Sequence, residues 1–259
     1  MLGMGRVNRV QKLSEFVLQQ RGEKRPRISG LSPRIFQEGP AAKALVEISG
    51  KTDTGKSFLL MELMARCALP SSFDGKGCDV ILLNLSHKLS GPLFKRRFLD
   101  MMKETATDHL HSADELNKAA NECLKAIKIL NCYSSEELEL ALVMLDHLLA
   151  ENEGVALIAV DTLCEFYWLD VREKRMRKHS YYMQWLSRLS QICNKHNVCC
   201  MYTLDQSFAE QKATTGTQLA IQIKVDHKIQ LKLLPDNQRT LNDQPIVIDD
   251  DGVNFLDVS

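Results

Sequence analysis

The sequence predicts an α/β fold in which a mostly parallel sheet is flanked by helices and ends in C-terminal antiparallel strands. Three observations lead to this prediction. A glycine-rich loop stands between a strand-like and a helix-like run, short apolar runs alternate with helical patterns through the middle of the chain, and the last segments alternate apolar and polar residues. Strands that alternate with helices favour a parallel sheet with right-handed crossovers.

The composition is compatible with one core of this kind. The chain has 259 residues, of which 44% are hydrophobic, and its 33 basic and 33 acidic residues give a formal charge of zero. Proteins that bind nucleic acid tightly on their own usually carry a basic excess, so any contact with DNA must come from a local patch or from partners. The longest apolar runs are far shorter than the ~20 residues of a membrane-spanning helix, so no membrane contact is expected.

The eight cysteines favour a reducing compartment over zinc binding. None of them forms a C-x-x-C pair, and most stand within apolar stretches, where a free cysteine behaves as a small hydrophobic side chain. The sequence shows no signal peptide, so the cytosol or the nucleus is expected.

The first forty residues differ from the rest. We therefore divide the chain into an N-terminal extension, residues 1–40, and a core, residues 41–259. In the extension, a basic stretch at 21–27 follows four apolar residues spaced for one face of a short helix, namely Val10, Leu13, Phe16 and Val17. The extension is either a flexible lead-in with a packed helix or a docking segment for a partner.

Periodicity places the elements of the core. Apolar or alternating runs predict strands at 45–48, 79–85, 126–132, 155–160 and 198–203. Apolar residues at helical spacing predict helices at 56–67, 92–103, 113–125, 135–150 and 180–195. The runs 79–85 and 155–160 are continuously apolar, which is typical of strands buried on both faces. The helix at 135–150 has Ser134 or Ser135 as its N-cap and glutamates in its first turn.

The tail changes from helices to strands. Residues 227–233 alternate as a strand, and residues 246–255 are predicted to form a hairpin that turns at Asp251 and Gly252. We expect antiparallel strands that extend the sheet at one edge. Residues 207–225 lack periodicity and are rich in Thr, Gln and Ala, so a loop is expected there.

The most informative motif is a phosphate-binding loop of the pattern G-x-x-x-x-G-K-[ST]. It consists of Gly50, Lys51, Thr52, Asp53, Thr54, Gly55, Lys56 and Ser57. Its glycines let the backbone wrap around phosphates, and the helix that follows turns free N–H groups and its positive dipole end toward them. Lys56 is expected at the β- and γ-phosphates of ATP, and the Ser57 hydroxyl at Mg²⁺. The alternative is a surface turn before an ordinary helix.

Asp161 is the second candidate ligand of Mg²⁺. It follows the buried strand 155–160, and the carboxyl end of a central strand is where phosphate-loop proteins place a carboxylate that holds the metal, usually through water. An Asp after an apolar strand is also common as a helix cap or a turn residue.

Two basic runs are candidates for contact with DNA. The first, 172–179, contains Arg172, Lys174, Arg175, Arg177 and Lys178, and these charges could bind a phosphate backbone through counterion release. The second, 94–97, is smaller. Either run can also be a solvated face. Few aromatic residues interleave with them, so base stacking is not expected.

Three further segments carry a resemblance to a known family. Residues 64–70 (MARCALP), 160–170 (VDTLCEFYWLD) and 248–255 (IDDDGVNF), together with the phosphate loop, resemble the RecA-like recombinase paralogues. The similarity extends from about Leu31 to Phe255 and is weak at 88–125 and 205–240. The phosphate loop alone would indicate only a superfamily, and the other strings make the resemblance specific.

The resemblance implies a RecA-like P-loop NTPase core and an accessory role in homologous recombination. Such proteins work in hetero-oligomers of paralogues that help load the strand-exchange recombinase on single-stranded DNA in the nucleus. The first basic run stands where the family carries its first DNA-facing loop. The chain lacks the F-x-x-A segment by which recombinases of this group link into filaments, which suits a subunit at one end of a hetero-oligomer.

The family also implies how ATP hydrolysis would be catalysed. Its catalytic Glu follows the strand after the phosphate-loop helix, and here Ser86 stands at that place, so ATP binding with slow or absent hydrolysis is expected. Gln206 stands near the position of a γ-phosphate sensor, although a lone Gln after a strand is commonplace. One alternative is a DNA-stimulated ATPase whose acid is Glu165 or comes from a partner subunit. Another is a P-loop kinase, which would need an Arg-rich lid after the core.

Overall fold

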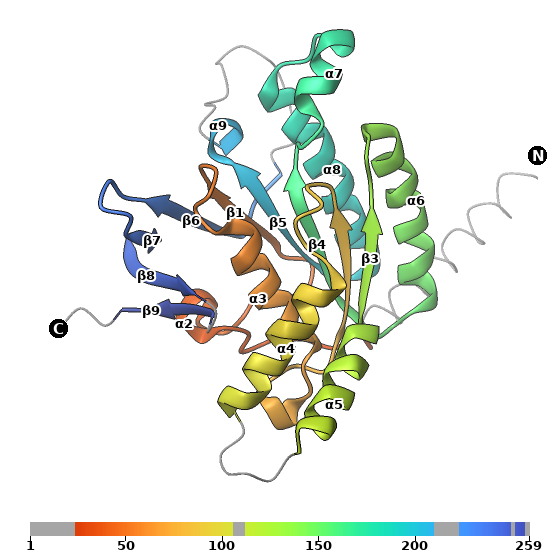
Figure 1. Cartoon of the computed structure of the whole chain (residues 1–259). Coiled ribbons are helices and arrows are strands. Elements are labelled where there is room, and N and C mark those ends of the chain that lie inside the picture. Colours follow the sequence, from red (N-terminus) through yellow and green to blue (C-terminus); the bar gives the residue numbers. More distant parts are fainter. Residues whose placement is uncertain (1–23, 106–111, 210–222, 250–251, 257–259) are drawn as a thin grey trace, which may run out of the picture.

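A computed structural model describes residues 24–105, 112–209, 223–249 and 252–256. Within these residues, nine strands form one sheet in the order β3-β2-β4-β5-β1-β6-β7-β8-β9 (Figure 1). Their bounds are β1 Leu45–Gly50, β2 Asp79–Asn84, β3 Ile127–Asn131, β4 Val155–Leu163, β5 Cys199–Asp205, β6 His227–Leu233, β7 Arg239–Leu241, β8 Gln244–Asp249 and β9 Gly252–Phe255. The predicted α/β fold with a mostly parallel sheet is confirmed.

In this sheet order, the six strands β3, β2, β4, β5, β1 and β6 are parallel to one another. The strands β7, β8 and β9 are antiparallel to their neighbours. The prediction of antiparallel tail strands was therefore right for β7 to β9 and wrong for β6, which pairs in parallel with β1. Residues 206–226 connect β5 to β6, and this length suffices for a crossover, which needs about a dozen residues. The hairpin of β8 and β9 is confirmed, although Asp251 in its turn lies outside the described residues.

Helices cover both faces of the sheet. Figure 1 shows α3, α4 and α5 on one face and α6 and α8 on the other. Their bounds, with those of the short helices, are α2 Pro33–Phe36, α3 Lys56–Ala68, η1 Ser71–Phe73, α4 Gly91–Thr105, α5 Ala113–Lys125, α6 Ser135–Glu151, α7 Tyr167–Lys174, α8 Lys178–His196 and α9 Gln206–Ala209. All five predicted core helices are present, and Ser134 is the N-cap of α6, since its Oγ accepts from Glu137 N at 3.2 Å.

Alternate residues of the central strands divide the core into two clusters. In β2, Val80 and Leu82 pack with α3, α4 and α5, whereas Ile81 and Leu83 pack with α6 and α8. This alternation follows from the two-residue period of a strand. A strand buried on both faces therefore reads as a continuous apolar run, which is why the sequence revealed β2 and β4.

Part of the predicted extension packs against the core. Ile28, Leu31 and Phe36 are buried in the cluster beneath α3. Arg25 donates to the carbonyls of His196 at 2.7 Å, of Asn152 at 2.8 Å and of Val155 at 2.9 Å, and also to that of Leu149. One guanidinium thus binds carbonyls at the C-terminal ends of α6 and α8 and at the start of β4. The candidate docking residues Val10 to Val17 lie outside the described residues.

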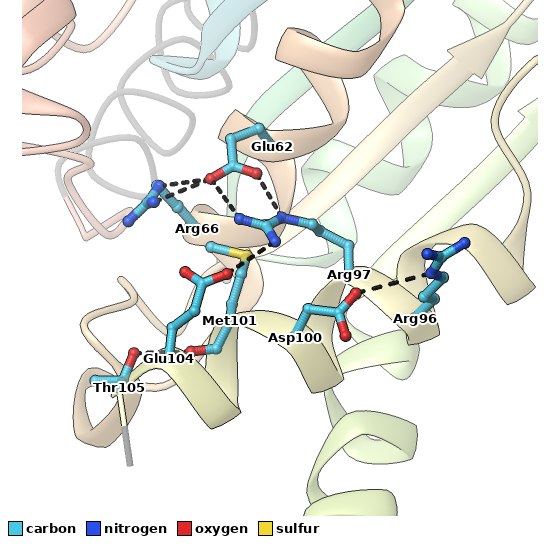
Figure 2. Close-up of polar contacts among 8 residues, drawn as sticks. All are labelled: Glu62, Arg66, Arg96, Arg97, Asp100, Met101, Glu104 and Thr105. Carbon is cyan, nitrogen blue, oxygen red and sulfur yellow. Dashed lines mark hydrogen bonds and ion pairs between the residues drawn. The ribbon is translucent and has the colours of Figure 1, made fainter. Parts of the chain in front are cut away.

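A buried ion pair joins α3 to α4 (Figure 2). Arg97 Nε donates to Glu62 Oε2 at 2.6 Å and Arg97 Nη2 to Glu62 Oε1 at 3.1 Å, and both side chains are at most 5% exposed. Burial by itself would lower the pKa of Arg97, but the hydrogen bonds and charge of Glu62 raise it. Arg66 and Glu104 extend the network. Arg97 is therefore not part of a basic surface, so the second candidate DNA patch is wrong at this residue.

We expect Arg97→Met to lower the free energy of unfolding by about 3 to 5 kcal/mol, because it leaves the Glu62 carboxylate buried without its main partner. Urea denaturation measures this. The double variant Glu62→Leu/Arg97→Met should recover most of the loss. Arg96→Met is the matched control, since Arg96 is 61% exposed and 3.9 Å from Asp100, and it should cost less than about 1 kcal/mol. A loss for Arg97→Met no greater than that of the control would contradict the prediction.

Candidate nucleotide-binding site

The parallel register brings several polar strand ends to one edge of the sheet. Gly50 at the end of β1 pairs with Asp205 at the end of β5, and Asn84 at the end of β2 pairs with Asp161 in β4. Carboxyl ends of parallel strands are the usual place for a ligand site in α/β proteins.

The predicted phosphate loop lies at this edge, between β1 and α3. Lys51, Thr52 and Asp53 form its exposed outer part, and Thr54 is buried, with its Oγ1 donating to Lys51 O at 2.9 Å. Gly50 has no room for a side chain, because a Cβ there would lie 2.5 Å from the carbonyl oxygen of Leu231. The loop is thus a tight backbone turn.

The loop leaves the start of α3 without a side-chain cap. Gly55 is the N-cap residue, with a φ of 97° that favours glycine, and no side chain caps the helix there. The first N–H groups of α3 therefore have no side-chain acceptor and, with the helix dipole, form a site suited to an anion.

Lys56 bends back over the loop. Its Nζ donates to Gly50 O at 2.9 Å and to Lys51 O at 2.6 Å. Burial lowers the pKa of Lys56, against the opposing charge of Asp205. The ammonium group is thus held at the mouth of the loop, where it would neutralise phosphate oxygens.

Asp161 is fully buried, and its carboxylate accepts from the hydroxyl of the adjacent Thr162 at 3.3 Å and from three hydroxyl groups of other elements. Ser57 in α3 donates to Oδ1 at 2.9 Å, Ser86 after β2 to Oδ2 at 2.5 Å, and Thr203 in β5 to Oδ1 at 2.6 Å. The two predicted metal residues, Ser57 and Asp161, are therefore in direct contact. Hard oxygen donors of this kind fit Mg²⁺. Among the described residues no cluster of three or more His, Cys, Asp or Glu side chains could hold a metal, so Mg²⁺ here would also need oxygens from a phosphate.

Ser86 follows β2, and its hydroxyl donates to Asp161 Oδ2. A hydroxyl that donates to a carboxylate cannot deprotonate water at neutral pH. Glu165, the alternative acid, lies in the turn after β4. Partial burial and the charge of Asp161 raise the pKa of Glu165, whereas the charges of Lys88 and His87 lower it. The net effect is a raised pKa. Glu165 is therefore within electrostatic reach of Asp161.

A pocket of about 250 Å³ continues from Ser57 between α3 and α4. Phe58, Met61 and Leu93 give it apolar walls, and the charged residues that line it are Lys88, Arg96, Arg97 and Asp100. Apolar walls with a few cations suit a flat heterocycle attached to an anionic group.

The sequence analysis overlooked Asp205. Burial by itself would raise its pKa, but hydrogen bonds from Ser207 and the charges of Lys56 and Lys178 lower it. Gln206, the predicted sensor, follows as the first residue of α9. The signal for Asp205 was available, because it follows an apolar strand as Asp161 does. The family resemblance pointed instead to Gln206, the next residue.

The first basic run is mostly helical, whereas a loop was expected. Arg172 and Lys174 belong to the last turn of α7, Arg175 and Arg177 to the link, and Lys178 begins α8. The three arginines are exposed.

Few aromatic residues interleave with this run in the sequence, but the fold brings Trp168 and Phe208 to Lys178. Lys178 Nζ lies 4.8 Å from the ring centre of Trp168 and 5.1 Å from that of Phe208. Trp168 lies on α7, one helical turn before the basic run. Phe208 comes from a distant part of the chain, on α9.

Comparison with known proteins gives the family. A profile of the AAA domain matches residues 32–204, which is well over half of the chain. The chain belongs to the AAA domain family. It is 29% identical over 150 residues to mouse DNA repair protein XRCC2, which covers 57% of this chain and 50% of the mouse protein. It is 24% identical over 169 residues to the Arabidopsis thaliana DNA repair protein XRCC2 homolog, which covers 54% of this chain and 45% of that protein.

The chain thus spans about half the length of the curated relatives it matches. The family match and these relatives confirm the resemblance to the RecA-like recombinase paralogues. No helix in the described part of the chain is long and apolar enough to cross a membrane.

We expect Asp205→Asn to tighten binding of Mg-ATP about fivefold, because it removes a negative charge that competes with phosphate for Lys56. Isothermal titration measures the affinity. Asp74→Asn is the control: Asp74 is an exposed turn residue with a φ of 56°, which Asn tolerates, and it should change nothing. Weaker binding by Asp205→Asn would show that Asp205 instead holds Lys56 or the metal in place.

Proposed function

We propose that this chain is an ATP-binding accessory factor in the homologous-recombination repair of DNA breaks. It acts as a subunit of a hetero-oligomer of recombinase paralogues in the nucleus, and it assists loading of the recombinase on single-stranded DNA. It binds ATP with Mg²⁺ and hydrolyses it weakly or not at all. The relatives are DNA repair proteins by name, and because the chain spans only about half of their length, the partners and the DNA are part of the proposal.

The geometry of the phosphate loop supports the nucleotide. Lys56 and the uncapped start of α3 would hold the phosphates, and Ser57 with Asp161 would hold Mg²⁺, which supplies charge neutralisation. The pocket between α3 and α4 would take the base. All the residues of this proposed nucleotide site belong to this one chain.

One observation supports the proposal that hydrolysis is weak or absent. Hydrolysis needs a group that orients or deprotonates the attacking water, and the side chain at the family's catalytic position is the Ser86 hydroxyl, which is already committed to Asp161 at 2.5 Å. The nucleotide would then favour an assembled state of the protein by binding alone.

The competing function is a DNA-stimulated ATPase that uses Glu165. The raised pKa of Glu165 and its position near Asp161 favour this alternative, since a general base works best with a pKa nearer to neutral. The kinase alternative has no such support, because the described part of the tail forms β6 to β9 where an Arg-rich lid would be needed.

We expect Lys56→Ala to weaken binding of Mg-ATP about 10- to 100-fold, because it removes charged hydrogen bonds to phosphate. Lys51→Ala, at the exposed lysine of the same loop, is the matched control and should bind normally. Turnover is measured beside binding, with and without single-stranded DNA.

We expect the unchanged protein to hydrolyse ATP no faster than Lys56→Ala does. DNA-stimulated turnover that Lys56→Ala and Glu165→Gln both abolish would replace the accessory function with the ATPase. Equal ATP affinity in all variants would refute the nucleotide site itself.

A further inference from the structure

A second lysine lies beside the candidate nucleotide site, on the loop between β2 and α4. Lys88 is exposed, and it lines the pocket that continues from Ser57. Its ammonium group forms no hydrogen bond or ion pair with any residue that the structure describes. The described part of the chain therefore provides no direct counter-ion for a cation that stands next to a site suited to anions.

The backbone of this loop is held in place. Ser86 N donates to Asp161 O at 2.8 Å, and Asn84 Nδ2 donates to Leu89 O at 3.0 Å, while the Leu89 side chain is buried. These contacts fix the chain on both sides of Lys88. A lysine that binds an anion benefits from such a base, because only its side chain has to be ordered on binding.

A short path of hydrogen bonds connects Lys88 with the residues proposed to hold Mg²⁺. Lys88 N donates to Ser86 Oγ at 3.3 Å, and Ser86 Oγ donates to Asp161 Oδ2 at 2.5 Å. Asp161 Oδ1 in turn accepts from Ser57 Oγ at 2.9 Å. The backbone of Lys88 is therefore separated from the proposed metal ligands by one serine hydroxyl, and its flexible four-carbon stem allows the ammonium group to reach an anion there.

The charge of Lys88 acts on two ionisable groups of the site. Burial lowers the pKa of Lys56, Asp205 opposes this effect, and Lys88 lowers the pKa further. Burial raises the pKa of Glu165, and Lys88 is the charge that opposes this rise most strongly. Two lysines close to one site repel each other while the site is empty, and an anion bound near both would offset that repulsion.

We infer that Lys88 binds the γ-phosphate of ATP within the same chain and so makes the nucleotide site prefer ATP to ADP. The inference rests on the proposed function for the nucleotide. Lys56 lies on the phosphate loop itself, whereas Lys88 comes from a different element, near Ser57 and Asp161. In phosphate-loop proteins the metal ion bridges the β- and γ-phosphates. A lysine beside the metal ligands is therefore placed for the terminal phosphate, which ADP lacks.

Two other roles are compatible with the position of Lys88. As a counter-ion of Glu165 it would affect the binding of neither nucleotide, although the two side chains form no ion pair in the structure. As a wall of the pocket between α3 and α4 it would contact the base, which ATP and ADP share. Only contact with the γ-phosphate makes the effect of Lys88 differ between the two nucleotides.

We expect Lys88→Ala to weaken binding of Mg-ATP about tenfold and to leave binding of Mg-ADP within about twofold, because it removes a charged hydrogen bond to the terminal phosphate. Isothermal titration of the full chain with each nucleotide measures both affinities. Lys88→Arg keeps a cation that binds phosphate and should retain most of the preference for ATP. Lys103→Ala, at an exposed lysine in the last turn of α4, makes the same change in net charge and should alter neither affinity.

The ADP affinity serves as the control for folding, since both nucleotides need the same phosphate loop. Equal losses for ATP and ADP in Lys88→Ala would place Lys88 at the base, and no loss for either would leave it as a counter-ion of Glu165. Either result overturns the inference, as does a loss in Lys88→Arg equal to that in Lys88→Ala.

Lys56→Ala, titrated beside these variants, separates the inference from the proposed function. If Lys56→Ala weakens neither nucleotide, the nucleotide site itself is refuted, and the inference with it. If Lys56→Ala weakens both nucleotides while Lys88→Ala leaves their ratio unchanged, the site stands and only the role of Lys88 is refuted.

Discussion

The buried carboxylate of Asp161 is the constraint on which the site depends. A charge removed from water must be matched by hydrogen bonds, and in the described residues hydroxyls of Ser57, Ser86 and Thr203 provide them. Each comes from a different element, so the carboxylate holds α3, the end of β2 and β5 in one register. The same contacts place Ser57 of the phosphate loop beside Asp161, which would supply a second oxygen to Mg²⁺.

A second carboxylate, Asp205, lies near the phosphate loop and near the start of α8. Asp205 is within electrostatic reach of both Lys56 and Lys178. Lys56 belongs to the phosphate loop, and Lys178 lies over the ring of Trp168. One carboxylate therefore interacts electrostatically with lysines of two separate elements.

The sequence revealed what depends on local pattern and missed what depends on tertiary neighbours. The strands β2 and β4 and the phosphate loop were predictable because burial on two faces and backbone tightness leave a mark in consecutive residues. The ion pair of Arg97 with Glu62, 35 positions away, leaves no such mark in consecutive residues. The run 94–97 therefore appeared to be a basic surface. Trp168 and Phe208 likewise come close to Lys178 only in the fold, and the parallel pairing of β6 depends on a connection without periodicity.

The contact between Ser86 and Asp161 also bears on the weak hydrolysis that we propose. A Glu at position 86 would replace a donor to Asp161 with a second carboxylate at the same place, and two close carboxylates raise each other's pKa. The new acid would therefore have to turn away from Asp161 or be separated from it by a cation such as Mg²⁺. The Ser86 hydroxyl, by contrast, stabilises Asp161 without adding a charge, which fits the binding with weak turnover that we propose.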